Sequence, residues 1–272
     1  MFFQPVATLT YTGGSMKEIV EDLKVEQESL DKFVSTLTEK DWDRMTPAEG
    51  WTIRDSISHI AYIDEVAVAA VHGDNSPFEL AFKIGMAFNE EGPKKGRNMK
   101  VNELLKWWWE ARNVMYAELI KLDPKARIPW FALPMGARAF ATARLMETWA
   151  HGLDCYDAMG ISPLDTDRLR HVAFLGYQAR PYAYTVHELP APDKPLRLEL
   201  VLPSGKMWTQ GPDGSENVIR GSAGDFCRVA VRRRHWQDTA LEIKGGEALR
   251  FVEIAQTFAG PSGSGRKPGQ TT

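Results

Sequence analysis

Four long segments before Pro163 carry apolar side chains at the three- and four-residue spacing of an α-helix. This pattern constrains the fold of the 272-residue chain more than any other feature. The segments run from Ser15 to about Leu37, from Thr52 to about His72, from about Lys100 to Leu122, and from Gly136 or Ala137 to Met159. Four amphipathic helices predict a bundle, and the core of a bundle is a place where proteins build metal sites.

Local signals mark the ends of these helices. Ser15 and Thr52 each precede an acidic residue by three positions, which is the capping-box pattern of a helix start. Gly73 and Gly160 follow the second and fourth segments, as expected of helix ends. The polar, glycine-containing segment 74–97 is therefore expected to connect the second and third helices.

The hydrophobic pattern changes after Pro163. A fifth helix is predicted from about Asp167 to His187, and the proline-rich linker 190–195 follows it. Apolar residues then alternate along 196–211 and 216–221, which predicts short strands in a hairpin, and a helix is expected over 221–234. A strand over 239–245 and a last helix over 246–260 complete a small α+β domain. The tail 261–272 is poor in apolar residues and is expected to be disordered.

The predicted fold class is therefore α+β. We expect a four-helix bundle over 15–163, a connecting helix and small α+β domain over 164–260, and the tail 261–272.

Composition excludes several classes of partner. The net charge of -3 and pI of about 6.1 give no bulk attraction to nucleic acid or to an anionic membrane. The two cysteines, Cys155 and Cys227, form no CxxC pair and are typical of a reducing cytoplasm. The N-terminal residues lack a basic segment, and no stretch reaches the length of a membrane span. We expect an unexported, cytoplasmic protein that acts on a small molecule.

Three residues form a candidate metal site. Glu147 and His151 are four positions apart in a predicted helix, so their side chains lie on one face. His59, in the second predicted helix, supplies the third ligand. Imidazole and carboxylate ligands suit zinc, nickel or iron, and three protein ligands leave room for water or substrate, as in catalytic sites. The chain has no HExxH metalloprotease motif. Two histidines and a carboxylate also match iron oxygenases, but this site is predicted on helices.

Two motifs carry a resemblance to a known family. The segment G-W-T-x-x-D-x-x-x-H, from Gly50 to His59, and the segment E-x-W-A-H-G-x-D, from Glu147 to Asp154, resemble the DinB superfamily. Within it, the chain resembles the actinobacterial mycothiol-dependent maleylpyruvate isomerases, in which a DinB-like bundle precedes a domain similar to sterol carrier proteins. The resemblance implies a metal on His59, Glu147 and His151, and mycothiol as cosubstrate.

The same resemblance implies an arginine of the second domain that orients an acidic substrate. The candidates are Arg228, Arg232, Arg233, Arg234 and Arg266. The basic run 232–234 is by itself typical of a solvated surface, or of a carboxylate or phosphate site at a domain junction.

Other residues near the motifs have simpler interpretations. Asp55 and Asp154 each lie one turn from a candidate histidine, where they either fix its tautomer or form polar surface. Cys155 is interpreted as a buried apolar residue. Residues 107–109 are three consecutive tryptophans that span about 200° of a helix, so two are expected to pack and one to face outward.

Three functional hypotheses follow. The first is a metal-dependent enzyme in which a thiolate adds to an electrophilic small molecule, as an isomerase or a transferase. The second is a metal-dependent hydrolase, lyase or cyclase that uses no thiol. The third is a non-catalytic protein that binds a small molecule or lipid, in keeping with the resemblance of the second domain to a sterol carrier.

Overall fold

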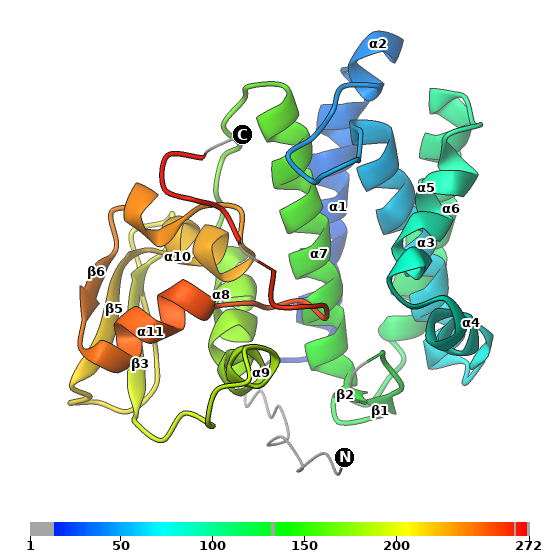
Figure 1. The fold of residues 1–272 in the computed structure, drawn as a ribbon. Helices are drawn as coiled ribbons and strands as arrows, with labels where there is room; N and C mark the ends of the chain where they lie inside the picture. The colour runs from blue at the N-terminus through cyan, green and yellow to red at the C-terminus, as the bar shows by residue number, and fades with distance from the viewer. Residues whose placement is uncertain (1–13, 132–133, 264, 271–272) are drawn as a thin grey trace. The chain divides into compact units, whose positions relative to one another are not determined.

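The computed structural model describes residues 14–131, 134–263 and 265–270, and it is mixed helix and sheet as predicted (Figure 1). Backbone contacts divide the chain into two compact units, with the boundary between Pro163 and Leu164. None of the described helices combines the length and the apolar character needed to cross a bilayer.

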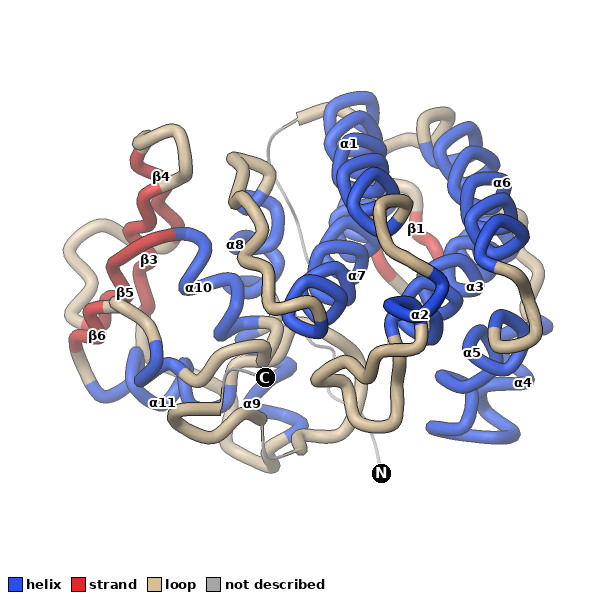
Figure 2. The backbone as a smooth tube through the Cα atoms, turned by 90° about the horizontal axis from the view of Figure 1, so that it is seen from above, coloured by secondary structure: helices blue, strands red, loops and turns tan. Residues whose placement is uncertain are grey.

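The N-terminal unit is a four-helix bundle. Helix α1 packs on α7 and α6, while α3 packs on α6 and α7, and Figure 2 views these helices from above. The four helices are α1 (Met16–Val34), α3 (Ile53–Val71), α6 (Val101–Leu119) and α7 (Ala137–Ala158). Their apolar faces meet in a core of fully buried side chains, among which are Ile57, Ile60 and Trp108, and Trp42, from outside these four helices, joins that core. The helices lie where the periodicity placed them, within a few residues at each end.

The predicted helix starts are confirmed. The Ser15 hydroxyl accepts a hydrogen bond from the backbone N–H of Glu18 at 3.2 Å. Thr52 and Asp55 form a complete capping box at the start of α3. Because this cap fixes the first turn of α3, it also fixes the position of every side chain further along the helix.

Segment 74–97 connects the second and third long helices as expected, and most of it is itself helical. It contains α4 (Ser76–Ile84), the 3-10 helix η1 (Gly85–Glu90) and α5 (Glu91–Gly96). Helix α5 packs closely on α3: a Cβ atom added to Gly92 would lie 2.7 Å from the Ser58 carbonyl oxygen and 3.0 Å from the His59 Cα. Gly92 therefore serves close packing of α5 on α3. Short elements complete the unit: α2 (Glu39–Trp42) and an antiparallel pair, β1 (Arg127–Ile128) and β2 (Met135–Gly136).

The C-terminal unit contains a four-stranded sheet in the order β4-β3-β5-β6. The strands are β3 (Leu196–Val201), β4 (Met207–Gln210), β5 (Asn217–Ser222) and β6 (Glu242–Lys244). Strands β3 and β4 form the predicted hairpin, with Val201 opposite Met207. The assignment of 216–221 to that hairpin is wrong. Strand β5 pairs in parallel with the other edge of β3, which the local alternation could not reveal.

Helices cover one face of this sheet (Figure 1). They are α8 (Leu169–Gln178), α9 (Arg180–Val186), α10 (Ala223–Ala230) and α11 (Gly246–Ile254), with the 3-10 helix η2 (Trp236–Asp238) after α10. The predicted fifth helix is interrupted at Ala179, because Pro181 lacks the N–H that would continue it. Helix α10 ends before the predicted residue 234, since Arg232 adopts a left-handed backbone with φ of 61°.

The tail differs from the expected disordered segment. Residues 261–263 and 265–270 lie against the C-terminal unit, and the Gly269 N–H donates to both carboxylate oxygens of Asp238 at 2.9 Å.

Candidate metal centre

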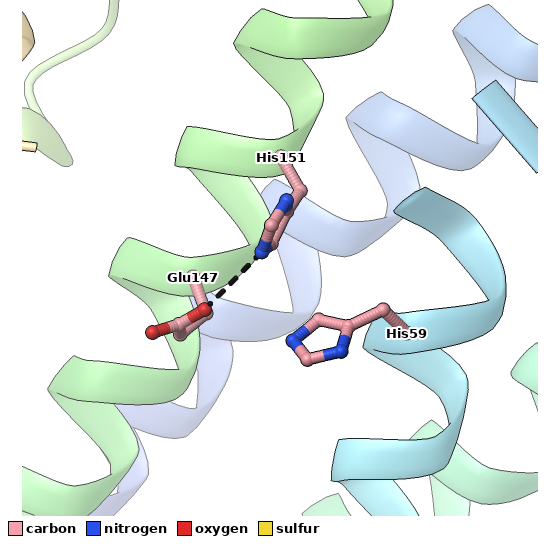
Figure 3. A group of neighbouring side chains, drawn as sticks. All are labelled: His59, Glu147 and His151. Atoms are coloured by element: carbon pink, nitrogen blue, oxygen red, sulfur yellow. Dashed lines mark ion pairs between the residues drawn. The ribbon is translucent and has the colours of Figure 1, made fainter. Parts of the chain in front are cut away.

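The structure brings the three predicted ligands together in the N-terminal unit. His59 comes from the middle of α3, and Glu147 and His151 come from adjacent turns of α7 (Figure 3). One ligand atom from each side chain lies within 4.8 Å of the others. The imidazole rings of His59 and His151 have centroids 5.0 Å apart. His59 and His151 are only 8% and 9% exposed, so the cluster lies at the edge of the bundle core.

The geometry follows from helix packing. The four-residue spacing stacks Glu147 and His151 on one face of α7, and α3 packs against that helix. On another face of α7, Gly152 lets α1 approach: a Cβ atom there would lie 3.4 Å from the Leu30 side chain, which is an ordinary contact. The site is therefore carried by rigid helices rather than by loops.

The charge states of the side chains favour metal binding at neutral pH. Burial lowers the pKa of His59 to about 3, and the neighbouring His151 contributes, so the His59 imidazole is neutral. Burial opposes ionisation of Glu147, but the hydrogen bond and charge of His151 and the charge of Arg144 lower its pKa to about 2. A neutral imidazole and an ionised carboxylate are the forms that ligate metals.

The distances fit a divalent ion. Glu147 Oε2 and His151 Nε2 are 3.4 Å apart. Zinc with four ligands at about 2.1 Å places neighbouring ligand atoms about 3.4 Å apart in a tetrahedron. A ligand atom of His59 lies within 4.8 Å of both, which completes a group of three potential ligands. Two imidazoles and one carboxylate also leave a net positive charge on a divalent ion, which suits an anionic fourth ligand.

Comparison with known proteins places this arrangement in a family. The family model of the mycothiol maleylpyruvate isomerase N-terminal domain matches residues 23–156, which include all three candidate ligands. An uncharacterized protein of Mycobacterium tuberculosis, found in two strains, is 40% identical over 250 residues, or 91% of this chain and 97% of that protein. The chain belongs to the mycothiol-dependent maleylpyruvate isomerase family.

Solved structures of the family have the same fold. The crystal structure of mycothiol-dependent maleylpyruvate isomerase matches with a TM-score of 0.54 and 16% identity, over 81% of this chain and 90% of that one. A histidine-to-alanine mutant of that enzyme matches with a TM-score of 0.55 and 16% identity, over 79% and 88%. At this identity, the similarity supports the fold alone.

In this family member, Trp51 forms a wall of the candidate site that sequence reasoning missed. Its ring lies 4.9 Å from the ring of His59 and 5.6 Å from that of His151, measured between centroids. Its indole N–H donates to Glu90 Oε1 at 2.6 Å. Arg97 donates to Glu90 at 3.1 Å and to Asp55 at 2.8 Å, which links the wall to the start of α3. The sequence feature that could have indicated this wall is the position of the tryptophan, directly before the N-cap Thr52.

The two aspartates next to the candidate histidines differ in role. Asp154 is 1% exposed, and its Oδ2 lies 3.4 Å from His151 Nδ1, as expected for a residue that fixes the imidazole tautomer. Asp55 is also buried, but it caps α3 and pairs with Arg97 instead. It is neither a partner of His59 nor polar surface, because Thr52 and Arg97 occupy its carboxylate.

A buried polar network beneath the ligands was also missed. Arg144 lies one turn before Glu147 on α7 and is 3.5 Å from Asp64 of α3. Gln27 donates to Asp64 at 2.8 Å and to Thr148 at 3.2 Å, and it accepts from the hydroxyl of Tyr116. The charge of Arg144 helps to keep Glu147 ionised. Only the packing of four helices brings these residues together, so no local pattern could identify them.

Two further predictions are confirmed. Trp107 and Trp108 are buried, whereas Trp109 is 56% exposed. Cys155 is fully buried, and burial raises the pKa of its thiol well above the usual range, so it is not a nucleophile.

Proposed function

We propose that this chain is a metal-dependent enzyme that uses mycothiol to isomerise an electrophilic small molecule such as maleylpyruvate. The observation that carries the proposal is the convergence of His59, Glu147 and His151 within 4.8 Å in a chain of the mycothiol-dependent isomerase family. Zinc is the proposed ion, because the 3.4 Å between Glu147 Oε2 and His151 Nε2 fits tetrahedral coordination, and imidazole and carboxylate are common zinc ligands.

A divalent ion held by these residues would favour the thiolate form of mycothiol and polarise a carbonyl group of the substrate. The residues around it have separate tasks. Asp154 Oδ2, 3.4 Å from His151 Nδ1, would favour the tautomer with its proton on Nδ1, which leaves Nε2 to ligate. Trp51 covers the His59 and His151 rings and excludes water from that side.

The proposed reaction conserves every atom. The thiolate sulfur adds to one carbon of an activated carbon–carbon double bond, whose π electrons move toward the conjugated carbonyl. The remaining single bond rotates, the electrons return, and the carbon–sulfur bond breaks to release the thiolate and the isomer. If the carbon–sulfur bond is retained and the adduct is protonated, the same site gives a transferase. Glu147 cannot accept the thiol proton while it ligates, so Asp154 or solvent takes that proton.

Steady-state turnover with purified, zinc-loaded protein tests this proposal. Maleylpyruvate should isomerise only when both mycothiol and the ion are present, and removal of the ion by a chelator should abolish turnover. His151→Ala should have no activity. His72→Ala is the matched control, since His72 follows α3 and pairs with Glu118 outside the cluster.

The other functional hypotheses predict different results. Undiminished turnover without a thiol would reject the thiol-dependent reaction and favour a hydrolase, lyase or cyclase. Full activity of His151→Ala would remove the proposed ligand set. Saturable binding of an apolar small molecule with no turnover of any electrophile would favour a binding protein.

A further inference from the structure

The two ends of helix α5 carry a pair of charged side chains that reach the wall of the metal centre. Glu90 is the N-cap residue of this short helix, and Arg97 is its C-cap residue. Seven residues are close to two helical turns, so the two side chains lie on the same face. Arg97 Nη2 lies 3.1 Å from Glu90 Oε2, which forms an ion pair along α5.

The other carboxylate oxygen of Glu90 holds the Trp51 ring. The indole N–H donates to Glu90 Oε1 at 2.6 Å. An indole side chain has a single hydrogen-bonding group, so this bond fixes the direction in which the ring points. In that position the ring lies against the imidazoles of His59 and His151. One charge-assisted hydrogen bond therefore keeps the wall in place over two of the proposed metal ligands.

The backbone of Trp51 is fixed independently of its ring. Its carbonyl oxygen accepts from the Thr46 N–H at 2.8 Å and from the Thr46 hydroxyl at 2.9 Å. Its own N–H donates to the Ala48 carbonyl oxygen at 3.0 Å. Because these bonds do not involve Glu90, rotation of the Trp51 side chain can move the ring while the backbone keeps its path.

Arg97 links this arrangement to the start of α3. Its Nε donates to Asp55 Oδ1 at 2.8 Å, and Asp55 belongs to the capping box with Thr52. The Asp55 side chain is 3% exposed, whereas those of Arg97 and Glu90 are 44% and 36% exposed. The contacts thus run from a buried cap to the wall through two solvated side chains, which form the weakest part of the series.

We propose that Trp51 is a gate on the metal centre, that Glu90 holds the gate closed, and that Arg97 is a positioning residue that acts through Glu90. With the indole bond intact, the ring limits the access of small reagents to the imidazoles. When that bond opens, the ring turns away and the imidazoles become accessible. The gate sets the rate at which the site exchanges its ion and leaves the affinity unchanged, because the ligand atoms stay in place.

This inference rests on the proposed function only in naming the ion as the group that is exchanged. The gate itself is present in the metal-free protein. Chemical labelling of that protein therefore tests it separately from the metal and the thiol.

The experiment is acylation of the full-length, metal-free protein by diethyl pyrocarbonate at pH 7, with initial rates at each histidine read by peptide mass spectrometry. The reagent attacks neutral imidazole, and His59 is neutral at this pH. His72, whose side chain is half exposed, is the internal reference for reagent concentration. In wild type, His59 and His151 should react much more slowly than His72.

Glu90→Ala removes the acceptor of the indole bond. It should raise the labelling rates of His59 and His151 about tenfold or more, since opening no longer breaks a hydrogen bond to a charged group. Arg97→Gln keeps that acceptor but releases it from its ion pair, so it should raise the same rates by a smaller factor, about threefold.

Lys95→Gln is the matched control. Lys95 also joins α5 to α3, through an ion pair with Glu65 at 3.1 Å, and its side chain is as exposed as that of Arg97. That ion pair includes neither Trp51 nor Glu90, so the control should label like wild type. Thermal unfolding of each variant checks that it folds.

Two readouts separate positioning from a general loss of structure. In the Glu90→Ala background, Arg97→Gln should add nothing to the labelling rates, because Arg97 acts through Glu90. In the zinc-loaded protein, the rate of zinc transfer to a chelator should rise in the same order of variants, while the zinc affinity measured by competition stays at the wild-type value.

Wild-type labelling rates in Glu90→Ala, or equal increases in Glu90→Ala and Lys95→Gln, would overturn the gate. Additive effects of Glu90→Ala and Arg97→Gln would reject the role of Arg97. If Glu90→Ala fails to fold, Glu90→Gln replaces it: its neutral oxygen is a weaker acceptor, so labelling should still be faster, and wild-type rates would reject the role of Glu90. If the protein binds no zinc, the proposed metal centre fails, while the labelling still decides on the gate.

Discussion

Substitution of Gly92 by alanine should disturb the metal centre from outside it. Helix α5 presses on α3 directly at His59, and the added Cβ would lie 2.7 Å from the Ser58 carbonyl oxygen, 2.8 Å from the Tyr62 Cβ and 3.0 Å from the His59 Cα. These atoms belong to the backbone or lie next to it, so no side-chain rotation relieves the overlap. Helix α5 or α3 must therefore move by roughly half an ångström.

The magnitude follows from two opposing terms. Overpacking of this kind costs about 1–3 kcal/mol, while the change from glycine to alanine within a helix stabilises it by about 1 kcal/mol. We therefore expect a net loss of up to about 2 kcal/mol in the free energy of unfolding. Because a metal site tolerates displacements of only about 0.5 Å, zinc affinity should fall by about tenfold or more.

Urea unfolding of the metal-free protein and a zinc-chelator competition measure the two effects. Gly152→Ala is the matched control, since it introduces the same methyl group into a helix next to the proposed ligand His151 but meets only ordinary contacts with Leu30. It should be neutral or slightly stabilising. Equal stability and equal zinc affinity of Gly92→Ala and Gly152→Ala would refute the account of α5 as the element that positions His59.

Three further predictions concern the bundle. Burial raises the pKa of Asp64 from 3.8 to about 6, so the folded protein holds that proton to higher pH than the unfolded chain. This preference stabilises the fold at low pH and is lost as pH rises from about 4 to 6, which costs up to about 3 kcal/mol. In urea unfolding across this range, Asp64→Asn should lose less stability than wild type, and parallel profiles would contradict the assignment. Trp51→Phe keeps a ring on the histidines but loses the donor to Glu90, so it should cost about 1 kcal/mol. A double-mutant cycle with Glu90→Ala, which removes the acceptor, should then show coupling, and additive effects would argue against this hydrogen bond. His151→Ala should lose its divalent ion, which elemental analysis would detect. The variant should remain folded, because the apolar core does not depend on the ion. Full metal occupancy in this variant would remove His151 from the proposed ligand set.

The helices of the bundle could be predicted because their signals are local. Ser15 and Thr52 bond to residues three positions away, so the sequence contains the whole capping interaction. Helix α5 could not be predicted, since the value of Gly92 lies in its contact with α3. The parallel pairing of β5 with β3 also depends on a crossover that alternation does not encode.

The candidate site divides in the same way. Helix geometry alone places Glu147 beside His151. The approach of His59 depends on the packing of α3 on α7, which no local spacing encodes, although His59 was predicted as the third ligand. The Trp51 wall and the pair formed by Arg144 and Asp64 join segments far apart in the sequence, so they emerged only from the structure.

X-ray absorption spectroscopy of the zinc-loaded protein, before and after addition of mycothiol, tests the central claim most directly. The account predicts nitrogen and oxygen ligands at about 2.0–2.2 Å with the outer-shell scattering of two imidazoles, and a new sulfur ligand at about 2.3 Å once the thiol is added. His151→Ala loaded with zinc should lack the signal of the second imidazole. A zinc spectrum without imidazole scattering would contradict the ligand set, and a spectrum that mycothiol leaves unchanged would contradict binding of the thiol to the ion.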